Sequence, residues 1–110
     1  MSSKVTNIFI VYQCLNMITG ASLWGSTKRW PRRKSQHMTL LRNNKHYNNR
    51  FQNAWNKYGE ENFTWIILDS FETQCEMINC EQRYLDRYYD KGNCYNLNPL
   101  ATGGNGRKRR

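Results

Sequence analysis

Residues 8–14 read Ile-Phe-Ile-Val-Tyr-Gln-Cys, a run of β-branched and aromatic side chains that stays apolar at consecutive positions as far as Tyr12. Consecutive apolar residues are typical of a strand covered on both faces, whereas a half-exposed strand alternates apolar and polar residues. This stretch therefore predicts a central strand. Residues 16–20 supply turn chemistry, and Ser22-Leu23-Trp24-Gly25 predicts the returning strand of a hairpin.

Two helices are predicted after this hairpin. Pro31 suits the first turn of a helix, where its missing N–H costs nothing, and this helix is expected to run to about residue 42. Residues 43–45 are polar and interrupt it. Apolar residues then recur at helical spacing over about 47–58, and Gly59 is suited to end that second helix.

A third strand and a long helix complete the predicted fold. Residues 63–68 are too short and too rich in strand formers to favour a helix. Thr73 and Glu76 have the spacing of a capping box, which predicts a helix over about 74–90. The sequence thus predicts an α+β fold with a small three-stranded antiparallel sheet flanked by about three helices.

The length of 110 residues allows one domain, which we place at residues 1–96, followed by a flexible basic tail at 97–110. The longest apolar run, residues 8–12, is far shorter than the ~20 residues of a membrane span and too short for a secretory signal. We therefore expect no membrane contact and an intracellular location, in the cytoplasm or nucleoid. The four cysteines have no zinc-binding spacing and are expected to be reduced, mostly buried thiols.

The net charge of +9 is distributed unevenly along the chain. Residues 1–59 contain ten basic side chains and no acidic one, residues 60–90 carry −6, and the remaining residues carry +5. A basic half without neighbouring acids keeps a positive surface that attracts a polyanion. Nucleic acid is therefore the expected partner.

Glu81 is the acidic residue that stands out. On the predicted last helix it falls on the same stripe as Ile78, Leu85 and Tyr88, so its carboxylate is expected to face the core. Burial of a carboxylate requires a partner. From the pattern alone, an arginine and a divalent cation are equally acceptable partners.

Arg33 and His37 form a second candidate site feature. At positions i and i+4 they are neighbours on one helix face, where both are expected to donate hydrogen bonds to an anionic oxygen. A solvated basic face is the commoner reason for such a pair. Together with an inward carboxylate and a polyanionic partner, however, the pair provides the groups needed for metal-assisted phosphodiester cleavage.

The chain resembles the GIY-YIG nuclease family over nearly all of residues 8–96. The most similar stretches are Leu41-Arg-Asn-Asn-Lys-His46 and Phe51-Gln-Asn-Ala-Trp-Asn-Lys-Tyr-Gly-Glu-Glu-Asn-Phe63. The spacing from Gly25 to Arg33 and His37 fits the family's glycine, arginine and histidine. The two motifs that name the family are represented by Ile10-Val11-Tyr12 and Leu23-Trp24-Gly25, so the first motif tyrosine is present and leucine replaces the second.

The resemblance implies a DNA endonuclease, of homing type, that hydrolyses phosphodiester bonds with a single divalent metal, Mg²⁺ or Mn²⁺. Tyr12 is expected to deprotonate or orient the attacking water, Arg33 to stabilise charge at phosphorus, and Glu81 to bind the metal. His37 is the fourth catalytic candidate. The expected DNA contacts are Lys28, Arg29, Arg32, Lys34, Lys45, His46 and Asn96, although Asn96 could instead tie down the backbone at the end of the fold.

Two alternatives to a competent nuclease stay open. Leu23 cannot form a hydrogen bond, so one alternative is a weakened or inactive DNA-binding module; a role on RNA is less favoured. Homing-type members carry a separate C-terminal DNA-recognition region. The chain is therefore expected to be either a catalytic domain whose recognition region is separate or missing, or a small protein that acts alone.

Overall fold

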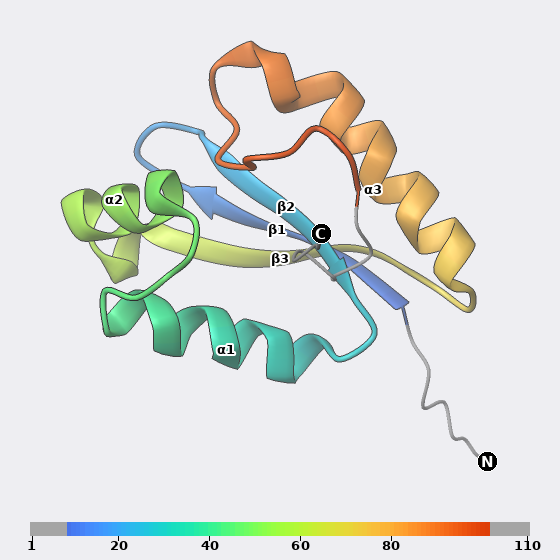
Figure 1. Cartoon of the computed structure of the whole chain (residues 1–110), viewed down its shortest axis with the longest axis horizontal. Helices are drawn as coiled ribbons and strands as arrows, with labels where there is room; N and C mark the ends of the chain where they lie inside the picture. The colour runs from blue at the N-terminus through green and yellow to red at the C-terminus, as the bar shows by residue number, and fades with distance from the viewer. Residues whose placement is uncertain (1–8, 102–110) are drawn as a thin grey trace.

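The structure is a computed structural model that describes residues 9–101. Its helices and strands follow the predicted order β-β-α-α-β-α, and two short 3₁₀ turns are added (Figure 1). The elements are β1 (Phe9–Asn16), β2 (Ser22–Thr27), α1 (Trp30–Arg42), α2 (Asn49–Tyr58), η1 (Glu60–Asn62), β3 (Phe63–Phe71), α3 (Gln74–Tyr88) and η2 (Tyr89–Lys91). The prediction of an α+β fold is confirmed.

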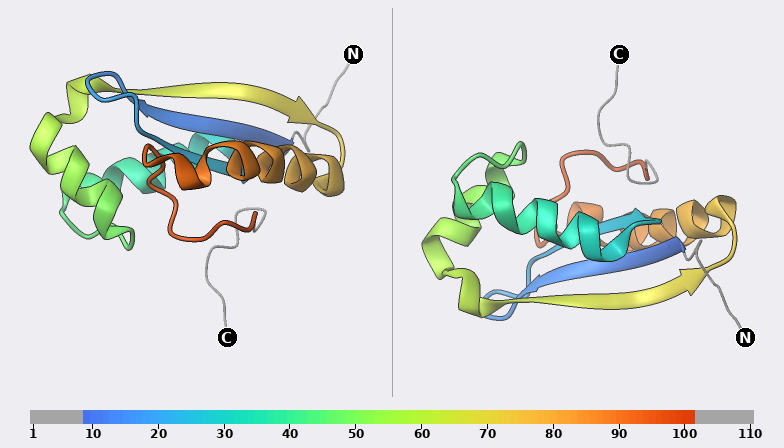
Figure 2. Two further views of the ribbon diagram at one scale, coloured as in Figure 1. Left: turned by 90° about the horizontal axis from the view of Figure 1, so that it is seen from above. Right: turned by 90° about the horizontal axis from the view of Figure 1, so that it is seen from below.

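The three strands form one antiparallel sheet in the order β2-β1-β3, so β1 is central, as predicted. Helix α3 covers one face of the sheet, and α1 and α2 lie on the other side (Figures 1 and 2). The pairing of β1 with β3 is irregular between Val11 and Tyr12, and Tyr12 lies opposite Gly25 of β2.

The apolar run that predicted β1 reflects two cores, one on each face of the sheet. Val11 packs with Met77 and Cys80 of α3. Cys14 belongs to the opposite core, which contains Phe51 of α2. Because both faces are covered, the strand needs apolar side chains pointing in both directions.

The helix ends agree closely with the signals in the sequence. Pro31 lies in the first turn of α1. Thr73 caps α3 by accepting a hydrogen bond from the Glu76 backbone N–H, but the Glu76 carboxylate accepts from the Thr73 hydroxyl instead of returning to the backbone. Helix α3 ends at Tyr88, two residues earlier than predicted, because the chain tightens there into a 3₁₀ turn.

The outer edge of β2 is covered by the segment that follows α3. Gly92 has a φ of 85°, in the left-handed region that glycine adopts without strain, and this reverses the chain after η2. Ser22 then forms a parallel bridge with Cys94. The segment therefore shields the backbone groups that an edge strand would otherwise expose.

The boundary predicted at residue 96 is too early. Gln82 of α3 donates a hydrogen bond to the Pro99 carbonyl at 2.8 Å and accepts one from the Ala101 backbone N–H at 2.8 Å. Residues 97–101 therefore continue the folded domain along α3. Residues 102–110, the rest of the predicted tail, lie outside the described part.

The cysteines are free thiols as predicted, with Cys14, Cys80 and Cys94 buried and Cys75 exposed. Within residues 9–101, none of the helices combines the length and the apolar character that a bilayer crossing requires.

Candidate active site

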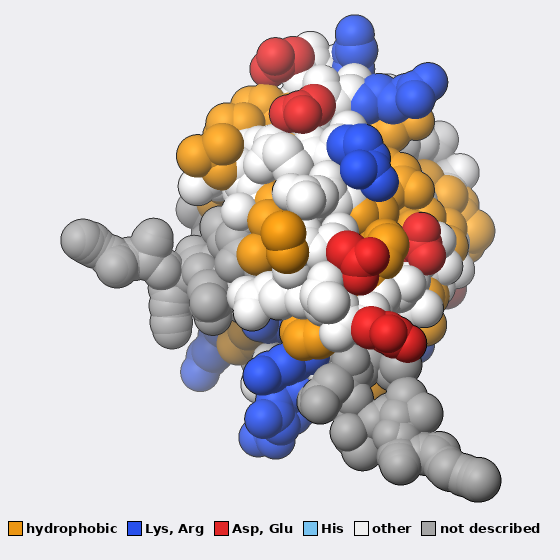
Figure 3. Space-filling model, turned by 90° about the vertical axis from the view of Figure 1, so that its right-hand side faces the viewer, with side chains coloured by type: hydrophobic (Ala, Val, Ile, Leu, Met, Phe, Trp, Pro, Cys, Tyr) orange, Lys and Arg blue, Asp and Glu red, His pale blue; other side chains and the backbone are white. Residues whose placement is uncertain are grey.

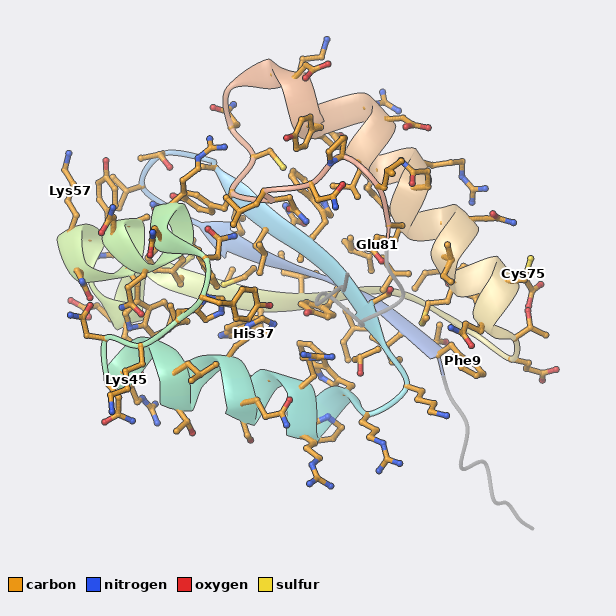
Figure 4. All side chains as sticks on the ribbon, viewed as in Figure 1. Phe9, His37, Lys45, Lys57, Cys75 and Glu81 are labelled. Atoms are coloured by element: carbon orange, nitrogen blue, oxygen red, sulfur yellow. The ribbon has the colours of Figure 1, made fainter. Side chains whose placement is uncertain are left out.

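A cavity at the β2 edge of the sheet brings together all four predicted catalytic residues. Its walls come from β1, β2, α1, the loop before α2, α3 and the C-terminal segment. Figure 4 shows His37 and Glu81 extending from opposite helices toward the strands. The lining residues are Tyr12, Leu23, Trp24, Gly25, Ser26, Arg33, His37, Tyr47, Asn48, Glu81, Asn96, Leu97, Asn98 and Leu100.

Tyr12 is positioned by what surrounds its ring. The ring packs against Trp30 with 4.8 Å between centroids, and only 3% of the residue is exposed. A Cβ added to Gly25 would overlap the Tyr12 hydroxyl. The glycine of the second motif therefore creates the space into which the tyrosine of the first motif extends.

A chain of hydrogen bonds runs from the α1–α2 loop to the Tyr12 hydroxyl. The Asn48 backbone N–H donates to His46 Nδ1 at 3.0 Å, His46 Nε2 lies 2.8 Å from His37 Nδ1, and His37 Nε2 lies 2.9 Å from the Tyr12 oxygen. A backbone N–H only donates, so His46 Nδ1 must be the acceptor. In a neutral imidazole the other nitrogen then carries the proton.

Applied twice, this rule fixes both tautomers. His46 donates from Nε2 to His37 Nδ1, and His37 donates from Nε2 to the Tyr12 oxygen. The Tyr12 hydroxyl proton is therefore not donated to His37 and can point into the cavity. Its oxygen retains one lone pair for a further donor, such as a water molecule.

The burial of these groups determines their charge. Burial, with the proximity of His46 and Arg33, lowers the pKa of His37 to about 3, and burial lowers the pKa of His46 to about 4. Burial raises the pKa of Tyr12 well above its ordinary value, although Arg33 acts in the opposite direction. At neutral pH both imidazoles are uncharged and Tyr12 keeps its proton, so this arrangement favours orienting a water molecule over removing its proton.

The predictions for the two histidines need correction. His37 was expected to donate with Arg33 to an anion, and His46 to contact DNA, but both are at most 5% exposed and all four ring nitrogens have partners inside the protein. Neither ring has a nitrogen left for a phosphate. Sequence spacing could not reveal this role, because Tyr12 and His37 are 25 residues apart.

Glu81 is buried in the site as its place on the helix stripe predicted, with 4% exposure. Ser26 of β2 donates a short hydrogen bond from its hydroxyl to Glu81 Oε1. Neither of the partners considered from the sequence was a serine. Ser26 fixes the carboxylate against the strand that also carries Gly25, and nothing in the local sequence pattern indicated it.

The donor set in the cavity fits a single hard cation. Glu81 is the one carboxylate among the residues that line it, and residues 9–101 contain no cluster of three or more His, Cys, Asp or Glu. Mg²⁺ is commonly bound through one or two carboxylates, with water and substrate phosphates as its remaining ligands. An enclosed site built from protein ligands alone is therefore not formed by the described residues, whereas a site completed by water and phosphate fits.

Arg33 enters the cavity from the first turn of α1, where its backbone N–H bonds to the Arg29 carbonyl at 2.8 Å. The side chain is half-buried. Its positive charge acts to lower the pKa values of Tyr12 and His37, although burial raises that of Tyr12 overall. A guanidinium held beside these groups presents a planar set of donors suited to a phosphoryl group.

The remaining basic candidates lie around the entrance to α1 and in the following loop. Lys28, Arg29, Arg32 and Lys45 are exposed, and Lys34 is half-buried. Figure 3 shows one group of Lys and Arg side chains at its lower edge, toward α1, and a second group at its top, beside acidic side chains. This placement agrees with a basic surface beside the cavity; contact with DNA stays a prediction.

Asn96 has the structural role that was left open. Its Oδ1 accepts from the Trp24 backbone N–H at 2.9 Å and its Nδ2 donates to the Trp24 carbonyl at 2.7 Å. The side chain thus pairs with the outer edge of β2 like a short strand. Contact with DNA stays a prediction for this amide, and it would have to use the second N–H of Nδ2, because the other is bonded to Trp24.

Comparison with solved structures supports this fold. The chain superposes on a glutamate-to-alanine mutant of the catalytic domain of intron endonuclease I-TevI with a TM-score of 0.74 and 23% identity, covering 86% of this chain and 97% of the other. The catalytic domain of homing endonuclease I-TevI matches with a TM-score of 0.71 and 25% identity, covering 80% and 96%. The chain has the fold of a GIY-YIG catalytic domain. No family model and no curated protein matches the sequence.

The GIY-YIG fold also accounts for the order of the site residues along the chain. Tyr12 comes from the central strand, Arg33 from the helix after the hairpin and Glu81 from the last helix. The local sequence patterns predicted the same elements for these residues. The functional roles of the three side chains stay predictions.

Proposed function

We propose that this protein is a DNA endonuclease of homing type that hydrolyses phosphodiester bonds with a single divalent metal, Mg²⁺ or Mn²⁺. The observation that carries the proposal is the convergence of Tyr12, Arg33 and Glu81 in one cavity. These residues lie on three different elements, so their meeting is a property of the tertiary fold. The likeness to a homing endonuclease catalytic domain supports the same activity.

Arg33, Tyr12 and Glu81 have different roles in the proposed reaction, which follow from their charge and position. Arg33 contacts non-bridging oxygens of the scissile phosphate and offsets the negative charge that develops there. Tyr12, fixed by His37, uses its free lone pair and its proton to orient the attacking water. Glu81, fixed by Ser26, holds the cation, which when bound would stabilise charge on the leaving oxygen.

DNA is the substrate that the surface favours. The basic candidates around α1 flank the cavity on the side of Arg33, and α1 itself carries no acidic residue. Lys and Arg side chains at this position neutralise backbone phosphates without reading sequence. Target recognition then requires a region beyond this basic surface, as homing-type enzymes have.

Nicking of supercoiled plasmid tests the proposal. Wild-type protein with Mg²⁺ or Mn²⁺ should convert supercoiled DNA to the open-circular form, and Glu81→Ala should reduce the rate by about 100-fold or more. Glu72→Ala is the matched control, because Glu72 is an exposed acid in the turn before α3. Equal nicking by wild type and Glu81→Ala would reject the mechanism.

A second candidate function is a DNA-binding module without turnover. The observation that favours it is Leu23, which lines the cavity at 7% exposure and offers no hydrogen bond. Such a module should bind DNA in a salt-sensitive manner and should leave plasmid intact at every concentration of either metal. Metal-dependent nicking that Glu81→Ala abolishes excludes it.

A further inference from the structure

Three hydroxyl groups line the candidate active site, and two of them are already engaged. Tyr12 is bonded to His37, and Ser26 is bonded to Glu81. The third belongs to Tyr47, in the loop between α1 and α2. Within residues 9–101 the Tyr47 hydroxyl has no hydrogen-bond partner.

Tyr47 is held at the mouth of the cavity by its neighbours in the loop. His46 and Asn48 on either side are buried, and the Tyr47 ring stacks on the His46 ring at 4.4 Å between centroids. The residue is nevertheless 64% exposed. It also borders a second groove that Arg33 lines along α1, so its side chain lies where DNA would approach the basic surface.

The charges around Tyr47 agree with this position. Desolvation of the part of Tyr47 that lines the cavity raises its pKa, although the charge of Arg33 acts in the opposite direction. Tyr47 in turn contributes to the raised pKa of Tyr12. Tyr47 is therefore close enough to both groups to interact with them. At neutral pH it keeps its proton and acts as a hydrogen-bond donor.

We propose that Tyr47 is a further catalytic residue, whose hydroxyl donates a hydrogen bond to the scissile phosphate beside Arg33. This inference rests on the proposed endonuclease function. Leu23 lines the same cavity and supplies no polar group, which leaves Tyr47 as the unengaged hydroxyl that can reach a phosphate there. Tyr47 thereby compensates for the hydroxyl that leucine lacks.

The test compares Tyr47→Phe with wild type in single-turnover nicking at saturating DNA. Loss of one donor to the reacting group should lower the rate by about 100-fold, while the dissociation constant for DNA changes by less than about threefold. Tyr58→Phe is the matched control, because Tyr58 packs against the core that contains Phe51 and does not line the cavity. Thermal melting of each variant checks that the fold is kept.

A double-variant experiment separates a catalytic role from a structural one. Leu23→Tyr adds a tyrosine to the cavity wall, so it should raise the rate of Tyr47→Phe by a larger factor than it raises the rate of wild type. The same factor in both backgrounds would overturn the proposal. So would nicking by Tyr47→Phe within about twofold of wild type, or equal losses of rate and DNA affinity.

The same experiment distinguishes this inference from the proposed function. If wild type nicks DNA and Tyr47→Phe nicks equally well, the role of Tyr47 is wrong and the endonuclease function stands. If wild type fails to nick with either metal, both proposals fall.

Discussion

The Tyr12 hydroxyl of the central strand lies 2.9 Å from His37 Nε2 of α1, and this contact ties the predicted water-orienting residue to a pair of buried, uncharged histidines. The Asn48 backbone N–H begins this series of hydrogen bonds, and because it can only donate, it determines the direction of every later bond in the series. His37, which its spacing from Arg33 suggested as an anion ligand, thus supports a neighbouring tyrosine instead, together with His46.

The first prediction concerns the two tautomers. Both imidazoles should carry their proton on Nε2 at neutral pH, because each Nδ1 accepts a hydrogen bond. Long-range ¹H–¹⁵N correlation spectra distinguish protonated from unprotonated ring nitrogens. An Nδ1–H form for either histidine would contradict the hydrogen-bond chain, and Tyr12→Phe is the control that removes its last member without altering the tautomer of His46.

The second prediction concerns stability and pH. Both histidines have folded-state pKa values of about 3 and 4, below the ordinary value near 6.5, so the unfolded chain binds more protons as pH falls below 6.5. This stabilisation is fully present above pH 6.5 and is lost as pH falls toward about 4 for His46 and about 3 for His37. Each histidine should contribute up to about 1.4 kcal/mol per pH unit between these limits.

Urea unfolding at pH 7, 6 and 5 measures the effect. The chain has only these two histidines, and their ordinary pKa lies inside this window, whereas that of the carboxylates lies below it. A free energy of unfolding that stays constant from pH 7 to pH 5 would show that the histidines are accessible to solvent protons in the folded state.

The third prediction concerns Gly25. A methyl group there would overlap the Tyr12 hydroxyl, and β1 would have to shift or the ring would have to turn. Gly25→Ala should cost about 1–3 kcal/mol of stability and should abolish most nicking. Gly25→Ala combined with Tyr12→Phe should recover little of the stability and no activity, because the added methyl would also overlap the ring carbon Cζ that phenylalanine keeps. Differential scanning calorimetry and the nicking assay provide the two readouts.

The fourth prediction concerns Asn96. Asn96→Ala leaves the Trp24 backbone N–H and carbonyl without their partner at the edge of β2, so it should destabilise the fold by about 1–3 kcal/mol. Asn98→Ala is the control, since Asn98 lines the same cavity but is exposed, and its side chain bonds, among residues 9–101, to the backbone N–H of Leu100. If Asn96→Ala melts like wild type and loses only DNA affinity, Asn96 is a DNA contact after all.

The sequence by itself determined the order of the elements, the central position of the first strand and the burial of Glu81. Each of these features depends on residues that are close together in the sequence. Consecutive apolar residues indicate the central strand, helical spacing indicates the burial of Glu81, and Pro31 and Thr73 mark where helices begin. The similar stretches before and within α2 pointed to the same fold, which the structure confirms.

Only the tertiary structure decided which atoms meet in the site. The Tyr12–His37 contact spans 25 residues, and the Ser26–Glu81 contact spans 55, and no local pattern determines such pairs. The exposure of Tyr47 beside Arg33 and the folding of residues 97–101 along α3 depend on the same packing. Hydrogen-bond direction and burial are properties of three-dimensional surroundings, which is why the surroundings of His37 and His46 differ from what the sequence suggested while the fold does not.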